Sequence, residues 1–471
     1  LQYYVPNAYQ GLVGRLTYEY ASRYLAEFNM GYNGTENFAK GKRFGFFPAV
    51  SLGWVISEEK FFPKNNIVKY LKVRGSYGEV GNDQIGGDRF LYLPSSYGAA
   101  SDSGVNKYNF GLASNPYTSL MIVENKIGNP DLTWEKAKKM NVGVDINLFN
   151  NCLTASFDIF KEKRNNILAN RSTSPMIIGA NLPAYNFGEM ENRGWEMDLN
   201  FRHHIQDFHY WARFNYSFAR NEIIYMDEVQ KRYDYQMTTG RRKNQFFGLI
   251  FDGYYNSWEE INALDRPKSS WSGNQLQPGD VKYIDVNQDG VIDDYDMVPI
   301  GYTPVPEIIY GFSFGAQYKG FDFSVTTYGA FGAQVARSWR KFSDGQYENY
   351  TTEVYDYWHG EGTSNRYPLL APGNSGQNFQ AISDIYIDDA DYVRIQNLTI
   401  GYDFKRIWKN CPFQQLRVYA AAQNLFTFTG YKGMDPENGR ALNDKEPWVT
   451  GVDVGTVSYT HLRAHETSLH L

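Results

Sequence analysis

The chain has 471 residues, a formal net charge of −6 and an isoelectric point near 5.8. It therefore lacks the basic field of a nucleic-acid-binding protein, and its two cysteines are too few for a disulfide scaffold. No apolar run of about 18 residues, the length of a transmembrane helix, is present. The mean hydropathy of −0.53 suits a soluble protein, but it also suits a membrane β-barrel, whose strands alternate between apolar and polar residues.

Alternation of apolar and polar residues is the dominant pattern along the chain, and it is typical of strands that have one apolar face. VGVDINL (142–148) and YGFSFGAQY (310–318) are clear examples. Helical periodicity is weak throughout. The predicted strands, in chain order, are 11–20, 23–32, 43–56, 67–80, 137–149, 152–163, 190–203, 207–222, 308–318, 321–331, 391–405 and 415–427.

The connections between these strands alternate between short turns and long polar loops. The short turns are 21–23, 57–66, 149–151, 203–206, 319–320 and 406–415. The long loops are 33–42, 81–136, 164–189, 223–307 and 332–390. Such long loops are unusual in a compact domain, whereas an outer-membrane barrel has short turns on its periplasmic side and long loops outside.

Aromatic residues near the strand ends suit the interfacial girdles of such a barrel. They are Tyr18, Tyr20, Tyr24, Phe28, Phe160, Tyr210, Tyr216 and Tyr402. The sequence thus predicts an all-β fold, a fragment of an antiparallel transmembrane β-barrel with short periplasmic turns and long extracellular loops. The competing interpretation is a large soluble β-protein with an aromatic core.

Eight segments of the chain, taken together and in this order, carry a family resemblance. They are GRLTYEYASRYLAEFNMGYNGTENFA (14–39), FFPAVSLGWVISEEKFF (46–62), LKVRGSYGEVGN (71–82), GNPDLTWEKAKKMNVGVD (128–145), NFGEMENRGWEMDL (186–199), PGDVKYIDVNQDGVIDDYDMVPIGYTPVPEIIYGFSFGAQYKGFDFSV (278–325), DYVRIQNLTIGYDF (391–404) and RVYAAAQNLFTFTGYKGMDPE (417–437). Through them the chain resembles the SusC/RagA-like TonB-dependent outer-membrane transporters.

The resemblance implies that residues 1–457 form the C-terminal part of the barrel, about 12 strands of a 22-stranded barrel. The family's plug domain and its TonB-contacting segment are then expected in a preceding part of a longer protein. The implied function is energised import of an oligosaccharide, less often a peptide, across the outer membrane, with no enzymatic activity. The implied partners are outer-membrane lipid, a SusD-like surface lipoprotein acting as a lid, and TonB through the preceding region.

The last residues depart from the family pattern. Alternation stops after residue 457, and His461, His465 and His470 crowd into the C-terminal segment. We interpret 458–471 as a non-native junction or a divergent tail.

The segment DVNQDGVIDDYD (285–296) has the spacing of a calcium loop, in which oxygen ligands occupy positions 1, 3, 5, 7, 9 and 12 and Gly occupies position 6. The candidate ligands are Asp285, Asn287, Asp289, the Val291 carbonyl, Asp293 and Asp296, with Gly290 at the sixth position. Asp replaces the usual Glu at position 12. The alternative is a metal-free turn in which the Asx side chains bond their own backbone.

No nucleophile–base pattern, phosphate loop or zinc motif is present, so no catalytic residue is assigned, and substrate-binding residues stay unidentified. Loop aromatics could stack on sugar rings or pack between loops; they are Tyr254, Tyr255, Trp258, Trp271, Trp339, Tyr347 and Tyr350. The competing function is a secreted β-rich protein that binds or cleaves glycans and carries a dockerin-like calcium loop. A dockerin needs two such loops beside helices, and only one is found, between strand patterns.

Overall fold

The structure is a computed structural model, and it describes most of the chain. The described residues are 8–84, 90–93, 96–99, 107–112, 115–173, 182–270, 276–337, 355–364, 367–370, 383–408, 411–433, 435–437, 452–453 and 461–463. They belong to two compact units. The first comprises residues 1–146, 158–194 and 221–230, and the second comprises 147–157, 195–220 and 231–471.

The main element is a 13-stranded sheet in the order β1-β2-β3-β4-β9-β10-β11-β12-β19-β20-β25-β26-β28. Its long strands are β1 (Tyr9–Tyr20), β2 (Tyr24–Thr35), β3 (Phe44–Val55), β4 (Val68–Asn82), β9 (Glu135–Leu148), β10 (Leu153–Ala169), β11 (Tyr185–Ile205), β12 (Phe208–Tyr225), β19 (Ile308–Tyr318), β20 (Phe321–Phe331), β25 (Tyr392–Asp403) and β26 (Arg417–Thr429). Every strand predicted from the alternation is present. The bounds of β19 and β20 are those predicted, and the other strands differ from their predicted bounds by one to six residues at an end.

Short connections join the strands at all six predicted places, but β11 continues through 203–205, so the turn predicted at 203–206 lies at 206–207. The backbone explains why the strands reverse at these turns. The β19–β20 hairpin turns through Lys319 and Gly320, which have φ angles of 47° and 95°. Two consecutive residues with positive φ match the right-handed twist of the flanking strands. At the β9–β10 turn, Phe149, Asn150 and Asn151 also have positive φ.

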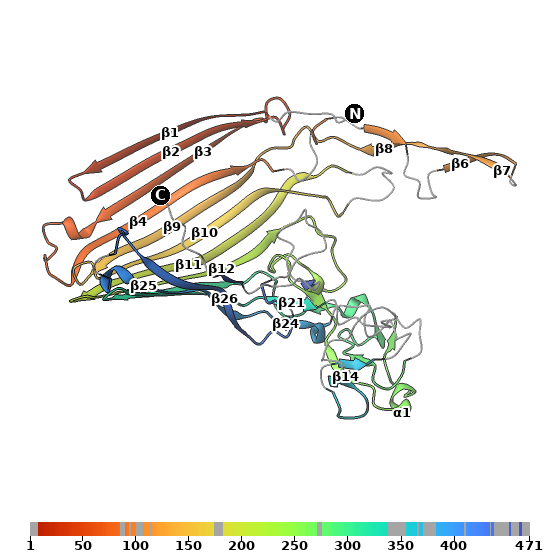
Figure 1. The fold of residues 1–471 in the computed structure, drawn as a ribbon. Coiled ribbons are helices and arrows are strands. Elements are labelled where there is room, and N and C mark those ends of the chain that lie inside the picture. The colour runs from red at the N-terminus through yellow and green to blue at the C-terminus, as the bar shows by residue number, and fades with distance from the viewer. Residues whose placement is uncertain are drawn as a thin grey trace. The chain divides into compact units, whose positions relative to one another are not determined.

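In the first unit, β1, β2 and β3 run side by side (Figure 1). Their register is continuous: Tyr18 is opposite Ala26, and Ala26 is opposite Leu52. Side chains on the face that carries these residues are apolar and exposed, with exposed fractions of 63% for Tyr18 and 62% for Leu52. An exposed apolar face over successive strands is what a lipid-facing surface requires.

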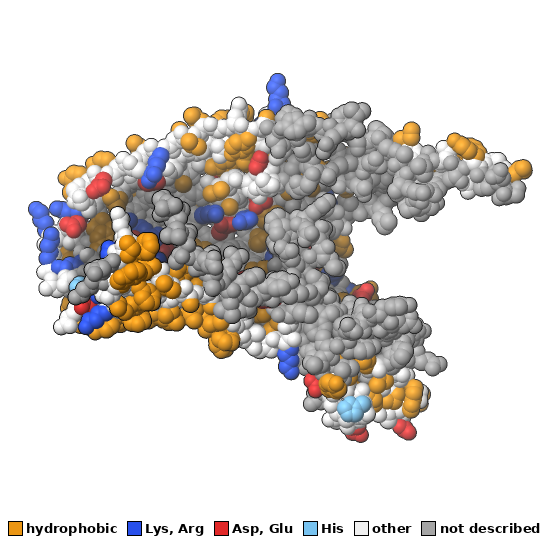
Figure 2. Space-filling model, viewed as in Figure 1, with side chains coloured by type: hydrophobic (Ala, Val, Ile, Leu, Met, Phe, Trp, Pro, Cys, Tyr) orange, Lys and Arg blue, Asp and Glu red, His pale blue; other side chains and the backbone are white. Residues whose placement is uncertain are grey.

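The second unit has the same two-sided character in β19, β20, β25 and β26. Figure 2 shows apolar side chains gathered over β25 and β26, and Ile400, Val418, Phe426 and Phe428 are more than half exposed. At the short-turn end of these strands, aromatic rings adjoin one another: Phe321 and Tyr402 have centroids 4.3 Å apart. Tyr402 therefore belongs to a cluster of aromatic side chains at this end of the strands, and its place in a membrane-interface girdle stays a prediction. Phe160 does not, because alternation places it on the face of β10 that carries Asp158 and Glu162.

The long connections contain small folded elements that the sequence pattern does not predict. In the second unit these include α1 (Trp258–Ile261) and the short strands β13 (Phe247–Gly248), β14 (Phe251–Tyr254), β15 (Lys268–Ser269), β16 (Val281–Tyr283), β17 (Val291–Ile292), β18 (Val298–Pro299), β21 (Gln334–Arg337), β22 (Tyr357–Trp358), β23 (Tyr367–Leu369), β24 (Ile387–Asp389) and β27 (Val452–Asp453). In the first unit they are β5 (Ser96–Ala99), β6 (Lys107–Leu112), β7 (Asn115–Leu120) and β8 (Ile122–Lys126).

The connection between β12 and β19 has its own apolar core. Leu249, Tyr254, Val281, Tyr283 and Ile292 are buried against one another. We call the described residues 231–307 that surround this core the loop module. Because so many apolar side chains are removed from water there, the loop module is a folded element.

The C-terminal segment contributes β28 (His461–Arg463), which pairs with Ala421–Gln423 of β26. The rest of the predicted tail, 458–460 and 464–471, lies outside the described residues. Among the described residues, no helix is long and apolar enough to cross a membrane.

Candidate functional site

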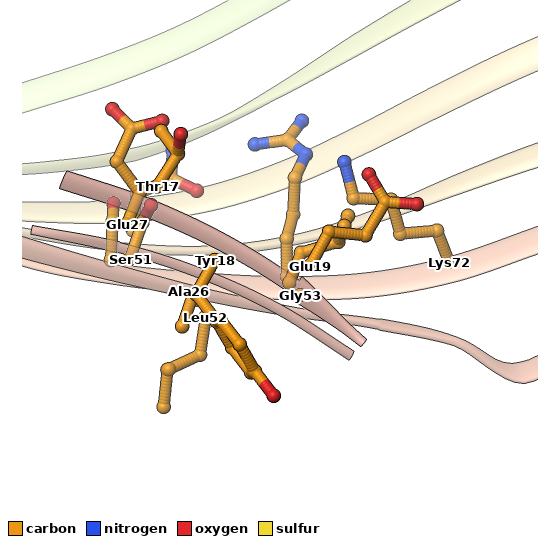
Figure 3. Close-up of a pocket in the computed structure, with 14 residues that line it drawn as sticks. Thr17, Tyr18, Glu19, Ala26, Glu27, Ser51, Leu52, Gly53 and Lys72 are labelled. Atoms are coloured by element: carbon orange, nitrogen blue, oxygen red, sulfur yellow. The ribbon is translucent and has the colours of Figure 1, made fainter. Parts of the chain in front are cut away.

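The face of the sheet opposite the apolar one is polar and, in the first unit, surrounds a hollow of about 520 Å³. In Figure 3, Thr17, Glu19, Glu27, Ser51 and Lys72 project to one side of the strands, whereas Tyr18, Ala26 and Leu52 project to the other. This separation follows from the two-residue period of strands. The polar residues of β1 to β4 therefore share one surface that is distinct from the apolar surface.

The charges in this hollow are paired across neighbouring strands. Arg15 on β1 contacts Glu27 on β2 at 2.7 Å, and Asn29 donates to the same carboxylate at 2.6 Å. Arg74 on β4 bridges two acids, with Nε 3.1 Å from Asp145 on β9 and Nη2 2.6 Å from Asp158 on β10. Arg74 thus ties three strands together on the polar face.

Gly143 makes the Arg74 bridge possible. A Cβ atom at this position would lie 2.5 Å from an oxygen of Asp158 and 2.9 Å from Cζ of Arg74. Both distances are below ordinary contact, so a larger residue would displace the guanidinium. The glycine in VGVDINL, which looks like an ordinary alternation position in the sequence, keeps this space open.

The second unit has a separate polar hollow of about 810 Å³. It is lined by Asn151, Thr154, Asp198, Asn200, Arg202, Arg213, Asn215, Gly311, Ser313, Thr326, Thr327, Tyr328 and Gln396. Most of these are neutral hydrogen-bonding groups, which suit a hydroxyl-bearing or amide-bearing solute.

A register shift shapes this second hollow. Asn397 and Ile395 of β25 pair with adjacent residues of β20, which leaves Gln396 as the extra residue of a bulge. Bulges redirect a side chain, and Gln396 lines the hollow. The sequence alternation breaks at this point, and that break is the only trace of the bulge in the sequence.

The predicted calcium loop is part of the loop module, and its side chains are brought together mainly by backbone amides. Asp285 accepts from the amides of Asp289 and Gly290, the latter at 2.7 Å. Asn287 Oδ1 and Asp289 Oδ1 accept from amides two residues further on. Gly290 has a φ of 83°, which explains the glycine at the sixth position.

Asp296 is the anchor of this loop. It is fully buried, and its carboxylate accepts from the amides of Val286 and Asp293, both at 2.9 Å. Burial raises the pKa of the Asp296 carboxyl above its ordinary value, although the amides that donate to it act in the opposite direction. Ile292, at the eighth position, enters the apolar core of the loop module.

No three His, Cys, Asp or Glu side chains are grouped as in a metal site within the part of the chain that the structure describes. The hydrogen bonds from backbone amides to the Asp and Asn side chains are those expected of the metal-free turn. They do not exclude metal binding, because each side-chain oxygen has a second lone pair that could bind a cation.

Among the loop aromatics, Tyr254 and Tyr255 are buried, so they pack inside the loop module instead of facing a solute. Trp258 is 54% exposed and remains available for contact. Trp271, Trp339, Tyr347 and Tyr350 lie outside the described residues.

Comparison with known proteins gives a consistent result. The family described as TonB dependent receptor-like, beta-barrel matches residues 2–425. TonB-dependent receptor P3 of Formosa agariphila is 28% identical over 469 residues, which cover 97% of this chain and 45% of the relative. TonB-dependent receptor SusC of Bacteroides thetaiotaomicron is 29% identical, with 92% of this chain and 42% of the relative covered. The chain thus spans less than half the length of these curated relatives.

Solved structures show the same fold. The RagAB peptide importer in the "closed-closed" state matches with a TM-score of 0.72 and 22% identity, over 96% of this chain and 46% of that chain. The RagAB peptide transporter matches with a TM-score of 0.70.

Proposed function

Since the chain belongs to the SusC/RagA-like TonB-dependent receptors, which are outer-membrane β-barrel proteins, we propose that it supplies barrel wall and extracellular loops to an active nutrient importer. The whole protein, which in the curated relatives is more than twice as long, would perform the transport. We assign the coupling of transport to energy to the whole protein and not to these strands and loops.

The observation that supports this role best is the opposed character of the two faces. Tyr18 and Leu52 expose apolar surface on one side of the sheet, while Glu27 and Lys72 lie in a polar hollow on the other. A soluble protein would cover the apolar face. A barrel needs it against lipid and needs the polar face toward the aqueous interior.

For the substrate we propose an oligosaccharide. The neutral amide and hydroxyl groups of the second hollow can donate to and accept from sugar hydroxyls. A peptide is the second candidate, because it is named for the RagAB importer, whose fold the chain shares.

For partners we propose a SusD-like surface lipoprotein over the extracellular loops and TonB at the preceding region. The loop module supports the first assignment, since a folded extracellular element with the exposed Trp258 gives a lid protein a defined surface. No role in catalysis is proposed.

Deletion of the gene for the whole protein tests the transport role. Growth of the deletion strain should fail on one class of oligosaccharide and remain normal on the corresponding monosaccharide. Loss of growth on peptides alone would favour the second candidate. Normal growth on every oligosaccharide and peptide would contradict an importer.

We also propose that the loop 285–296 binds calcium and thereby braces the loop module. Its oxygen spacing supports this proposal, as does the buried Asp296 carboxylate, whose charge a cation would stabilise. Calcium should slow proteolytic cleavage in this loop of the whole protein, and Asp289→Asn should remove the effect. Asp265→Asn, at an exposed position elsewhere in the module, is the control. Equal cleavage with and without millimolar calcium would exclude the site.

The secreted, dockerin-like alternative loses its support. The calcium-like loop lies between β16 and β18, and α1 in the same module has only four residues. The family match and the two-sided sheet favour the outer-membrane protein.

A further inference from the structure

The apolar surface of the first unit ends abruptly at one end of β9 and β10. On β9 the outward residues Met140 and Val142 are about half exposed and apolar, and on β10 so is Ile159. By strand alternation, the next outward positions are lysines. We call these four residues, Lys136, Lys138, Lys161 and Lys163, the lysine band.

Each lysine of the band contacts a glutamate on a neighbouring strand. Lys161 reaches Glu191 and Lys163 reaches Glu189, both at 2.8 Å. Lys136 and Lys138 share Glu79, at 3.7 Å and 3.9 Å. The lysine side chains are 39–56% exposed and the glutamates 17–33%. The ammonium groups are therefore the outermost charges, with the carboxylates below them.

The band carries an excess of positive charge. The four lysines contact three carboxylates, those of Glu79, Glu189 and Glu191, so these ion pairs leave one positive charge in excess. Exposed ion pairs of this kind add only about 0–1 kcal/mol to stability, so pairing alone gives little reason for the band. Each ammonium has three donors and can bind a further anion beside its glutamate.

The position of the lysine band along the strands indicates which kind of anion could bind to it. β9 begins after the long connection 83–134 and β10 ends before the long connection 170–184, so the band lies at the extracellular ends of both strands. At the opposite ends, Leu148 and Leu153 keep the outward face apolar up to the turn. On β9 and β10 the lysines thus adjoin the apolar surface at the long-connection end, which we expect to lie near the lipid headgroups of the outer leaflet.

We propose that the lysine band binds the phosphate groups of a phosphorylated glycolipid, lipid A, in the outer leaflet of the outer membrane. The acyl chains lie along the apolar residues of β9 and β10, and the phosphates contact Lys161, Lys163 and their neighbours. The positive charge of the lysine band complements the phosphates, and the band is continuous with the apolar surface that faces lipid. For these two reasons we favour a lipid over a soluble anion.

The test is lipid binding by the whole protein in detergent, measured by native mass spectrometry. The probes are bisphosphorylated lipid A, the same lipid after dephosphorylation, and phosphatidylethanolamine. The wild-type protein should prefer the phosphorylated lipid, and added salt should reduce that preference. Lys161→Gln combined with Lys163→Gln should weaken binding of phosphorylated lipid A about five-fold for each lysine removed.

Two variants control for unrelated effects. Lys60→Gln with Lys64→Gln removes two exposed lysines from the short β3–β4 turn and should leave lipid binding unchanged. Lys161→Arg with Lys163→Arg keeps the charges and should retain binding. Equal wild-type affinity for phosphorylated and dephosphorylated lipid A would overturn the proposal, even if the glutamine variant did not fold. So would unchanged binding by a folded glutamine variant.

Discussion

Arg74 shows how a single residue contributes to the barrel on its polar face. Its guanidinium lies between Asp145 and Asp158 and is about one-third exposed. Because the two acids are held close to it, Arg74→Leu should leave them repelling each other and destabilise the barrel by about 1–3 kcal/mol. The temperature at which the whole protein loses its folded mobility in detergent electrophoresis measures the change.

Arg15 is the matched control for Arg74. It also pairs with an acid on the polar face, but its side chain is 66% exposed. Because water screens this pair, Arg15→Leu should change stability by well under about 1 kcal/mol. Equal effects of the two substitutions would show that the Arg74 bridge has no special role.

Asp296 should give the loop module a stability that depends on pH. Burial raises the pKa of its carboxyl above the ordinary value, so the protonated form fits the folded loop better than the ionised form. Without calcium, protection of 285–296 should be greatest below the ordinary pKa and should fall as the pH rises through the folded pKa. Amide hydrogen exchange of this segment, corrected for the pH dependence of the intrinsic exchange rate, measures this protection.

Calcium should reverse that trend, because bound calcium favours the ionised carboxylate. With calcium, protection should be greater near neutral pH and should decline as acid protonates Asp296. If the hydrogen-exchange protection of 285–296 changed with neither pH nor calcium, the ionisation of Asp296 would not determine the stability of this loop.

At the scale of the strand, β9 separates lipid-facing from polar positions. Val144 is the middle one of the outward apolar residues between Met140 and Leu148, whereas Asn141 lines the polar hollow. Val144→Lys should therefore destabilise the barrel by about 2–4 kcal/mol, the cost of a lysine near the middle of the bilayer. Asn141→Lys should have little effect. Equilibrium unfolding from lipid bilayers compares them, and similar losses for both would mean that the two faces are wrongly assigned.

The strands and turns were predictable from the sequence because alternation is a local signal. The alternation within VGVDINL is enough to predict which residues of β9 share a face. The partners of Arg74 were not predictable, because Asp145 and Asp158 are 71 and 84 residues away and only the register across three strands brings them together. The role of Gly143 depends on the same register.

The loop module was missed for a different reason. Its strands β13 to β18 have only two to four residues, which is too short for alternation to appear. The burial of Tyr254 and Tyr255 depends on contacts between these fragments, so the sequence could not distinguish them from aromatics that face a solute. The calcium-like spacing was readable because all its residues lie within one local turn.

For the whole molecule, a barrel wall in the outer membrane requires every short turn to face the periplasm and every long loop to face outside. The two native cysteines, Cys152 and Cys411, are free and adjoin the β9–β10 and β25–β26 turns. In a background with both changed to Ser, single cysteines can report on each surface. Leu264 is fully exposed in a long loop, Ile159 is 57% exposed on the apolar face, and Lys64 is exposed in a short turn.

The most direct test is labelling of these three positions in the whole protein with a membrane-impermeant maleimide. Leu264→Cys should react in intact cells, and Lys64→Cys should react only after the outer membrane is permeabilised. Ile159→Cys should stay unlabelled until the protein is denatured. Labelling of Lys64→Cys in intact cells, or rapid labelling of Ile159→Cys in the membrane, would contradict the assignment of this chain as a barrel wall with its long loops outside.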